Sequence, residues 1–478
     1  MTDDLKLASA LNRFGLGARP GDPDRRDDPH TLLTRQMTGD AGTSAFASLP
    51  SSAEYVHREA ALLASLRQAK RQRDDDAMLR VRDDMSMQGD ASMSPRRMRR
   101  GGGRGDLRAA VRDELDARYG HAVTTPDGFA ERLVRFWSNH FAVSLDKRPA
   151  LLYAAPMERE AIRANLFGRF DALLVAVESH PAMLRYLDNV RSVGDDSRIA
   201  RRVAGKRQLG LNENLAREIL ELHTLGVDGG YTQGDVTELA RAITGWSTPA
   251  PRESIDAVPP AAFVFRPNAH EGGARRVLGR TYADAGVQQG HAILRDLAVH
   301  PSTARHVSTK LARHFIADEP PRAVVDRMAQ AWTRNGGTLA DVYRALIDSP
   351  EAWARTARKF RTPDDFLIAA LRAMDASQPI ARLQPVLAQL GEPAFTPRSP
   401  AGFPDATSAW NGGDALFKRI QAAQRLASLT ASPDPLATAR IALGPHLDDA
   451  TATTLRRAES ARSGLALLFA SPAFQWRT

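Results

Sequence analysis

Apolar side chains recur at intervals of three and four residues through most of the segment 107–250. This spacing marks one face of an α-helix, which has about 3.6 residues per turn. The clearest stripe consists of Leu133, Phe136, Trp137, His140 and Phe141. The same periodicity returns after residue 287. Because helices bury an apolar face by packing on other helices, we predict an all-α fold built as a multi-helix bundle.

Two stretches break the helical pattern. Residues 261–267 (AAFVFRP) and 274–282 (ARRVLGRTY) are short extended runs on either side of a His-Glu-Gly-Gly sequence, which predicts a small β-hairpin or a stiff loop. Residues 392–415 are rich in proline, glycine and aromatic side chains, as is typical of an ordered irregular loop. We therefore expect the bundle to carry a small β-hairpin excursion and irregular aromatic loops.

Composition and patterning divide the chain into five segments. They are an N-terminal helical segment (1–52), a charged helix with a disordered Arg-rich insertion (53–106), a helical core with two polar helices (107–250), a loop or hairpin excursion (251–286) and a C-terminal helical region (287–478). The part of the insertion from residue 84 onward has no aromatic or β-branched side chain. Such a composition buries too little apolar surface to order a chain.

Arginines are concentrated in the insertion. The window 95–108 contains Arg96, Arg97, Arg99, Arg100, Arg104 and Arg108. Since this window supplies much of the formal net charge of +9, the high isoelectric point is weak evidence for nucleic-acid binding by the folded body. The window itself resembles an RG-type nucleic-acid segment, although no aromatic side chain is interleaved for base stacking. A solvated loop and a nucleic-acid-binding segment both remain open.

The absence of cysteine excludes disulfides, thiolate zinc sites and cysteine nucleophiles. A divalent metal would therefore need His and carboxylate ligands. No stretch approaches the ~20 apolar residues of a membrane span, and the start, MTDDLKLAS, is acidic where a secretory signal is basic. We expect a cytoplasmic protein by default, or a periplasmic one through co-export with a partner.

Residues 212–226 (NENLAREILELHTLG) combine an apolar stripe with a polar one. At about 100° per residue, the polar face holds Asn214, Arg217, Glu218 and Glu221. His223 falls on the opposite side of this wheel. Periodicity alone favours a solvated face, but the next helix repeats the format with Asp235, Glu238 and Arg241 before Trp246. A short loop joins the two helices, so we expect them to pack antiparallel and to oppose their charged faces.

Several segments resemble one bacterial family, called domain of unknown function 1800. They are ALNRFGLGARPGD, LVRFWSNHFAVS, NENLAREILELHTLGVDGGYTQGDVTELARAITGW, the His270-Glu271-Gly272 loop, HPSTARHVSTKLARHF and SPAGFPD. The resemblance spans nearly the whole chain and is poorest at residues 53–106. It implies a mostly helical protein and frequent genomic pairing with the family called domain of unknown function 1501, which looks like the alkaline phosphatase/sulfatase superfamily. It implies no established reaction.

Two histidines stand out as site candidates. His140, in Trp-Ser-Asn-His-Phe, either is a core histidine or emerges with Asn139 into a pocket beside Trp137. His270 lies in a loop flanked by glycines and could form an acid–base pair with Glu271. By contrast, His306 and His314 are interpreted as ordinary helix residues, and Lys310 as a lysine whose stem lies along apolar surface.

Three functional hypotheses follow. The first is a polar-pocket protein, a metal-dependent or acid–base hydrolase in which His140, Glu218, Glu221 and His270 are catalytic. Its binding residues would be Asn139, Asn214, Arg217, Trp246 and Glu271. The second is a non-catalytic accessory protein that binds an exported sulfatase- or phosphatase-like companion of the 1501 family. The third is nucleic-acid binding through the Arg-rich insertion.

Overall fold

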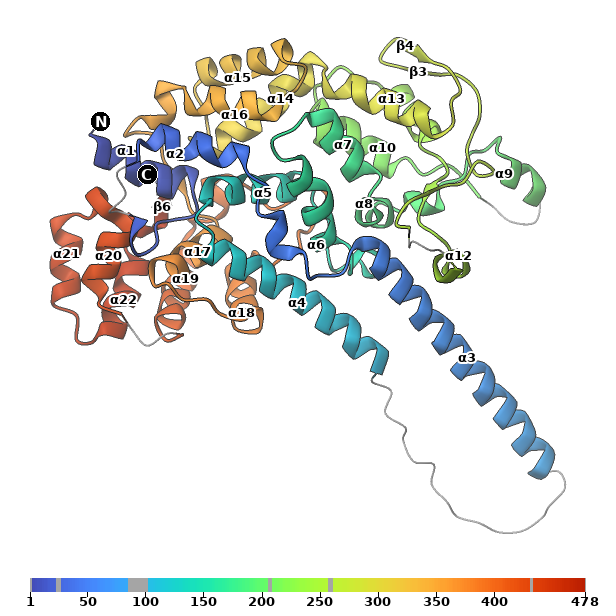
Figure 1. Cartoon of the computed structure of the whole chain (residues 1–478), viewed down its shortest axis with the longest axis horizontal. Coiled ribbons are helices and arrows are strands. Elements are labelled where there is room, and N and C mark those ends of the chain that lie inside the picture. Colours follow the sequence, from blue (N-terminus) through green and yellow to red (C-terminus); the bar gives the residue numbers. More distant parts are fainter. Residues whose placement is uncertain are drawn as a thin grey trace.

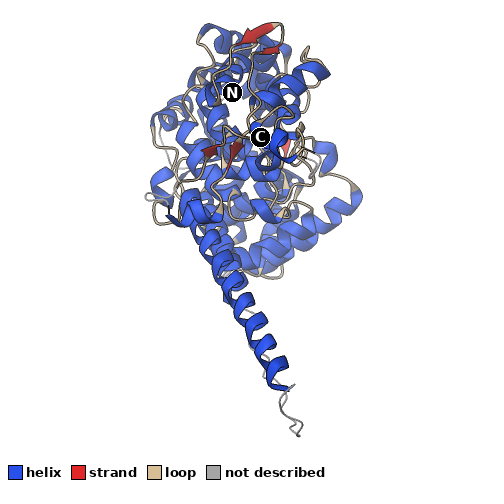
Figure 2. Ribbon diagram, turned by 90° about the vertical axis from the view of Figure 1, so that its right-hand side faces the viewer, coloured by secondary structure: helices blue, strands red, loops and turns tan. Residues whose placement is uncertain are grey.

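The computed structural model describes residues 2–22, 27–84, 102–204, 209–256, 261–429 and 433–477. Helices dominate these ranges, and their strands form only small two-stranded sheets (Figures 1 and 2). The prediction of an all-α bundle is therefore confirmed. Within the same ranges, no helix combines the length and the apolar character needed to cross a membrane.

The N-terminal quarter begins with short helices and continues into two long ones. The short helices are α1 (Asp3–Ser9), η1 (Ala10–Phe14), α2 (Pro29–Arg35), η3 (Gln36–Thr38) and η4 (Thr43–Phe46). Helices α3 (Ser52–Asp84) and α4 (Gly102–Thr124) then project from the body toward the same side (Figure 1). The long exposed helix expected over 53–83 is present as α3. Residues 85–101, with Arg96, Arg97, Arg99 and Arg100, lie outside the described residues.

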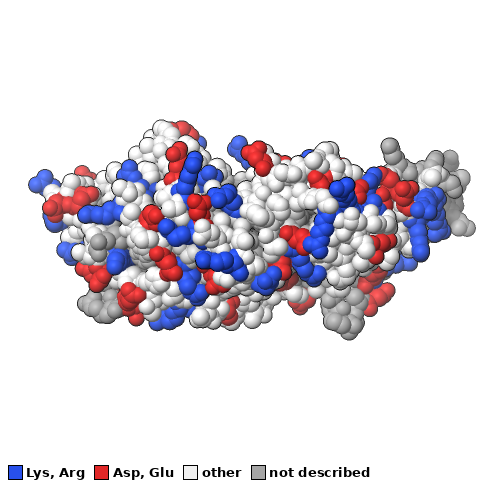
Figure 3. All heavy atoms as spheres, turned by 90° about the horizontal axis from the view of Figure 1, so that it is seen from above, with Lys and Arg blue, Asp and Glu red and all other residues white. Residues whose placement is uncertain are grey.

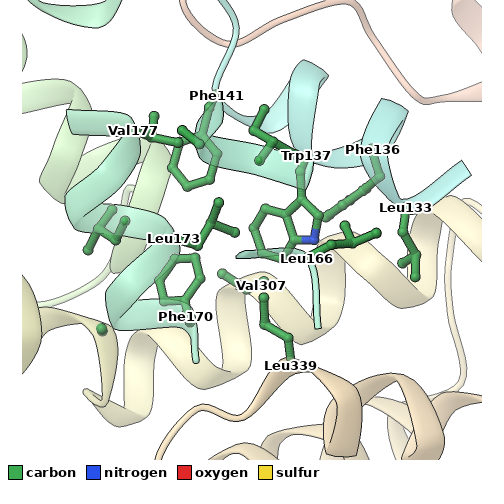
Figure 4. Packing of buried hydrophobic residues seen from close by; sticks show 14 of the residues in the cluster. Leu133, Phe136, Trp137, Phe141, Leu166, Phe170, Leu173, Val177, Val307 and Leu339 are labelled. Carbon is green, nitrogen blue, oxygen red and sulfur yellow. The ribbon is translucent and has the colours of Figure 1, made fainter. Parts of the chain in front are cut away.

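The central region packs around α5. Its helices are α5 (Gly128–His140), η5 (Arg148–Ala150), α6 (Ala154–Met157), η6 (Glu158–Ile162), η7 (Arg163–Asn165), α7 (Phe170–Glu178), α8 (Pro181–Tyr186), η8 (Asn189–Arg191), α9 (Arg198–Val203), α10 (Asn214–Glu218), η9 (Ile219–Thr224), α11 (Gln233–Ala242) and α12 (Pro251–Asp256). The predicted stripe of α5 is buried, and Trp137 packs among Phe141, Phe170 and Leu173 (Figure 4).

The chain after residue 286 adds two groups of helices. The first closes the central core and consists of α13 (Val287–Ala298), α14 (Pro301–Phe315), α15 (Arg322–Arg334), α16 (Leu339–Ile347) and η10 (Pro350–Trp353). The second forms a separate apolar cluster with the end of α4. It consists of α17 (Pro363–Ala373), α18 (Ile380–Leu390), η11 (Thr407–Ala409), α19 (Gly413–Ala427), α20 (Pro435–Leu443), η12 (Gly444–His446), α21 (Asp449–Arg456), α22 (Ala461–Ala470) and α23 (Pro472–Gln475).

The expected small β-hairpin is present, formed within residues 275–282 rather than between the two extended runs. Strand β1 (Trp246–Ser247) pairs antiparallel with β2 (Val264–Phe265), and β3 (Arg275–Val277) pairs with β4 (Arg280–Tyr282). Between β3 and β4, both Leu278 and Gly279 have positive φ, at 47° and 78°. A two-residue turn of this kind joins two neighbouring antiparallel strands, so β3 pairs with β4. Strand β2 pairs with β1 and not with β3. Strand β5 (Lys359–Phe360) pairs with β6 (Trp476–Arg477) near the C-terminal end.

The polar helix departs from the assumed geometry. Residues Ile219–Thr224 form a π-helical segment, η9, which continues α10. A π-helix closes i→i+5 hydrogen bonds, so each residue turns by less than 100° and the wheel used for the sequence is only approximate here. His223 is fully buried, whereas Glu218 and Glu221 are partly exposed, and the carboxylate that it meets comes from another helix. The Nδ1 of His223 lies 2.8 Å from Oε1 of Glu178 on α7, and both side chains are fully buried.

A chain of buried ion pairs joins α4, α5 and the η6–η7 segment. Arg163 contacts Glu131 at 2.7 Å and Glu158 at 3.4 Å, and Glu158 also accepts from Arg118 at 2.8 Å. Burial alone would raise the pKa of Glu131, but Arg163 and Arg135 outweigh it and lower that pKa to about 2. The chain extends from α5 into the floor of a large cavity.

Candidate functional site

A cavity of about 720 Å³ opens between the two apolar clusters. Its walls come from the end of α4, from α5, from the last turns of α14, from the start of α17 and from the loop over residues 392–408. The floor is charged, whereas the loop side presents phenylalanine, proline and alanine. The cavity thus combines an apolar rim with polar groups converging at its base, the usual character of a small-molecule site.

Helix α5 supplies the floor because its polar residues lie on the face opposite the Trp137 stripe. Arg132 donates from Nη1 to Asp365 at 2.8 Å, and Arg135 pairs with Asp364. Burial, together with Asp364, raises the pKa of the nearby Glu392 carboxyl to about 8, so this group is protonated at neutral pH. The floor is therefore a set of compensated charges rather than an excess of one sign.

Asn139, at the end of α5, holds the loop in place. Its Nδ2 donates to the backbone oxygen of Phe403 at 2.9 Å, and its Oδ1 accepts from the backbone N–H of Phe403 at 2.7 Å. Gly402 precedes this contact with φ +82°, and a Cβ there would lie 2.4 Å from the backbone oxygen of Asn139. Only glycine fits, because the position needs both left-handed backbone and the space of the missing side chain.

We expect Gly402→Ala to destabilise the protein by about 1–3 kcal/mol and to displace the loop from Asn139. The measurement is urea unfolding followed by circular dichroism. Gly412→Ala is the matched control, since a Cβ at Gly412 meets no atom within 4 Å and its φ of −65° suits alanine. A cost for Gly402→Ala no larger than for Gly412→Ala would contradict this explanation.

Helix α14 presents Lys310 and His314, four residues apart, to the same cavity. The helix starts at Pro301 because the His300 side chain accepts from the N–H of Ser302, capping the first turn. His314 Nδ1 lies 3.1 Å from Oδ1 of Asp405 in the loop. Its Nε2 is buried and has no hydrogen-bond partner in the described part of the chain. Burial lowers the pKa of His314, against the opposing effect of Asp405, so the imidazole is neutral at pH 7.

Asp405 connects His314 to Lys359. The Lys359 ammonium donates to Asp318 at 2.5 Å and to the backbone oxygen of Asp405 at 2.6 Å. Burial would raise the pKa of Asp405, but His314 and Lys359 lower it to about 2. A permanently ionised carboxylate thus fixes the orientation of the His314 ring.

His140 lies deeper than His314. Its Nε2 is 3.2 Å from the backbone oxygen of His223, and its ring stacks on Phe136. Burial, with Lys310 nearby, lowers its pKa well below the usual value. His140 is therefore neutral. The sequence left a core position and a pocket position as alternatives, and His140 is both buried in the core and part of the cavity wall.

A family model described as "Protein of unknown function (DUF1800)" matches residues 9–476. The chain belongs to this family. No curated protein and no solved structure matches it. Three of the family-like segments meet at the cavity of this DUF1800 protein: Asn139 and His140 come from WSNHF, Lys310 and His314 from KLARHF, and Asp405 from GFPD.

The other predicted site residues do not line this cavity. Glu218 is half-buried, and burial raises its pKa against the effect of nearby His223. The Glu221 carboxylate accepts from the hydroxyl of Tyr231 at 3.3 Å. Asn214 is exposed at the start of α10, and Arg217 bridges Glu213 at 3.2 Å.

His270 and Glu271 belong to a third location, beside the end of α11. His270 Nδ1 is 3.0 Å from the backbone oxygen of Thr244, and burial lowers the pKa of the imidazole. Glu271 contacts Arg241 at 3.2 Å and accepts from the backbone N–H of Asp195 at 2.8 Å. Trp246 is fully buried in β1. The charged face of α11 therefore contacts Glu271 and Arg275. His270 lies in this location and His140 in the cavity, so the two histidines belong to separate sites.

From the sequence, Lys310 and His314 were interpreted as ordinary helix residues and Asp405 was not considered, whereas the structure places all three in the cavity wall. A usable signal existed, because His306, Lys310 and His314 recur every four residues and so share one helix face. The partner Asp405 comes from a loop ninety-one positions away, and spacing alone cannot predict such a contact. No group of three or more His, Asp or Glu side chains placed to hold a metal ion occurs in the described part of the chain.

Proposed function

We propose that this protein is an acid–base enzyme, a hydrolase of a small molecule, with its active site in the cavity between α5, α14 and the 392–408 loop. The observation that carries the proposal is the His314–Asp405 pair, 3.1 Å apart, in the wall of that cavity. A carboxylate on one ring nitrogen of a histidine leaves the other nitrogen to transfer protons. The proposed centre replaces Glu218, Glu221 and His270 by His314 and Asp405, and keeps His140.

The chemistry assigns one role to each group. His314, neutral at pH 7, accepts a proton from a water molecule through Nε2, the atom without a partner in the described structure. Asp405 holds the ring and stabilises the imidazolium that forms. Asn139 fixes the loop that carries Asp405, so it acts as a positioning residue.

The test uses the full chain and three probes, the p-nitrophenyl esters of acetate, phosphate and sulfate. His314→Asn is expected to lower the hydrolysis of the probe that is turned over by about 10²–10⁴-fold, the usual contribution of a general base. His30→Asn is the matched control, because His30 also pairs with an aspartate, Asp348, but is half exposed and does not line the cavity. Equal rates for the wild type and His314→Asn, including no turnover by either, would contradict the proposal.

The variant Asp405→Asn tests whether Asp405 orients the His314 ring or only stabilises the fold. Because Asp405 raises the pKa of His314 against burial, its removal should shift the acid limb of the rate profile to lower pH as well as slow the reaction. A merely structural role would lower the amount of folded protein and leave the pH profile in place.

The accessory role remains the alternative, and one observation favours it. On α19, Leu416, Phe417 and Ile420 are exposed large apolar side chains, and such a group is typical of a surface that contacts another protein. We propose this patch as the docking surface if a companion of the 1501 family binds. Co-purification from the native operon is its test.

Nucleic-acid binding and metal dependence also stay predictions. The Arg-rich segment falls mainly on residues outside the described ranges. On the face seen in Figure 3, Lys and Arg are interspersed with Asp and Glu and form no single-sign field. Gel shifts at varied salt and metal analysis of the purified protein test these two hypotheses.

A further inference from the structure

Lys310 is a cation in the cavity wall that has no carboxylate partner in the described part of the chain. Three carboxylates of the cavity pair with a permanent cation: Asp364 pairs with Arg135, Asp365 with Arg132, and Asp405 with Lys359. The Lys310 ammonium has no hydrogen bond or ion pair in the described part of the chain, although it lines the cavity. The Lys310 side chain is only partly buried, so a ligand in the cavity can reach the ammonium without displacing a protein carboxylate from it.

The groups facing Lys310 do not supply that partner. From α5 comes His140, and from its own helix come His306 and Arg313. Asp405 is the nearest acid, but it is already engaged by His314 and Lys359. Glu319 lines the mouth and is exposed. These groups supply imidazoles and another cation, but no carboxylate that is free to pair with Lys310.

The cavity that Lys310 lines also has apolar side chains in its wall. The 392–408 loop contributes Phe395 and Phe403 together with prolines and alanines, and α5 contributes Phe136. Phe395 has a positive φ of 49°, a conformation that costs a non-glycine residue free energy and that clusters at ligand sites. Its backbone oxygen is held by the N–H of Leu145 at 2.8 Å. Aromatic side chains and a cation without a carboxylate partner, in one cavity, favour a ligand that has an apolar part and an anionic part.

We propose that the cavity binds a small organic acid, whose carboxylate or phosphate pairs with Lys310 while its apolar body contacts Phe136, Phe395 and Phe403. The proposal deepens the proposed function, on which it rests for the choice of cavity, by naming the substrate class of the same site. Arg313, exposed at the mouth and bonded through Nε to the backbone oxygen of Asp318 at 3.0 Å, adds a second positive charge on the path of entry.

The pH dependence supports the assignment and has a definite sign. Burial lowers the pKa of Lys310 to about 8, with Asp405 opposing and Arg313 adding to the effect. An anion favours the charged amine, so the bound form takes up a proton near this pH. Affinity is expected to be constant below pH 8 and to fall as the pH rises through 8. An acid that binds elsewhere on the surface would not follow this titration.

The experiment is calorimetric titration of the full chain with benzoate and phenyl phosphate as acid probes, and benzamide as the neutral isostere of benzoate. Lys310→Met should weaken binding of the better acid probe by about 10–100-fold, as expected for loss of one charge-assisted contact. The matched control is Lys418→Met, since Lys418 is exposed and pairs with Asp414 at 2.6 Å. Benzamide should bind the wild type at least about tenfold more weakly than benzoate.

Folding and function are separated by two further measurements. Lys310→Met removes a partly buried charge that has no ion pair in the described part of the chain, so its midpoint of thermal unfolding at pH 7 should not fall below that of the wild type. His314→Asn should bind the acid probes like the wild type, so its loss of turnover would speak to the catalytic proposal alone. Equal affinity of Lys310→Met and wild type, equal affinity for benzoate and benzamide, or no binding of either acid at millimolar concentration would overturn the inference.

Discussion

Replacing Arg163 with methionine is expected to lower the free energy of unfolding by about 3–5 kcal/mol. The guanidinium is fully buried and contacts Glu131 and Glu158, whose side chains are 1% and 3% exposed. It also donates to the backbone oxygen of Ala41 at 3.0 Å. Without Arg163, two carboxylates remain inside the protein, and Arg135 and Arg118 compensate them only in part.

Urea unfolding of the two forms measures this effect. Arg169→Met is the matched control, because Arg169 also pairs with an acid, Asp171, but is half exposed. A surface pair of this kind contributes at most about 1 kcal/mol. If Arg163→Met costs no more than Arg169→Met, the buried chain of ion pairs does not stabilise the fold as described.

The second large effect is a loss of stability in acid. Arg163 lowers the pKa of Glu131 to about 2, and His314 with Lys359 lowers that of Asp405 to about 2. Arg132 lowers the pKa of Asp365 further still. A carboxyl with a lowered folded-state pKa stabilises the protein above its unfolded pKa and loses that effect as the pH falls through the folded value.

We therefore expect the free energy of unfolding to fall between about pH 5 and pH 2, by about 2–3 kcal/mol for each of these carboxyls. Urea unfolding at a series of pH values measures it. Glu131→Gln should be less stable than the wild type at pH 7 and should show a shallower slope in this window. A variant whose slope matches that of the wild type would show that Glu131 is not held ionised by its arginines.

The sequence predicted the helical class and the apolar face of α5 because both depend on local periodicity. For Asn139 and His140 it left a core position and a pocket as alternatives, because both fit the end of an apolar stripe. Near position 220 the helical wheel is only approximate, because η9 is a π-helix and its side chains do not follow a 3.6-residue period.

The partners that define the candidate site are contributed by tertiary structure. Asp405 meets His314, and Phe403 meets Asn139, across long sequence separations, so no helical wheel could pair them. Lys310 was interpreted as a lysine lying along apolar surface. Its position in the helical period fits this role as well as it fits a role in a binding site. Its significance depends on the absence of a carboxylate partner, which requires coordinates.

The most direct test of the central claim, that this protein acts in the cavity between α5, α14 and the 392–408 loop, is a crystal structure of the full chain grown with phenyl phosphate. The account predicts the phosphate within hydrogen-bond distance of Lys310 Nζ and the phenyl ring against Phe136, Phe395 or Phe403. A probe bound outside the cavity, or a cavity that contains only ordered water at saturating probe, would contradict the account.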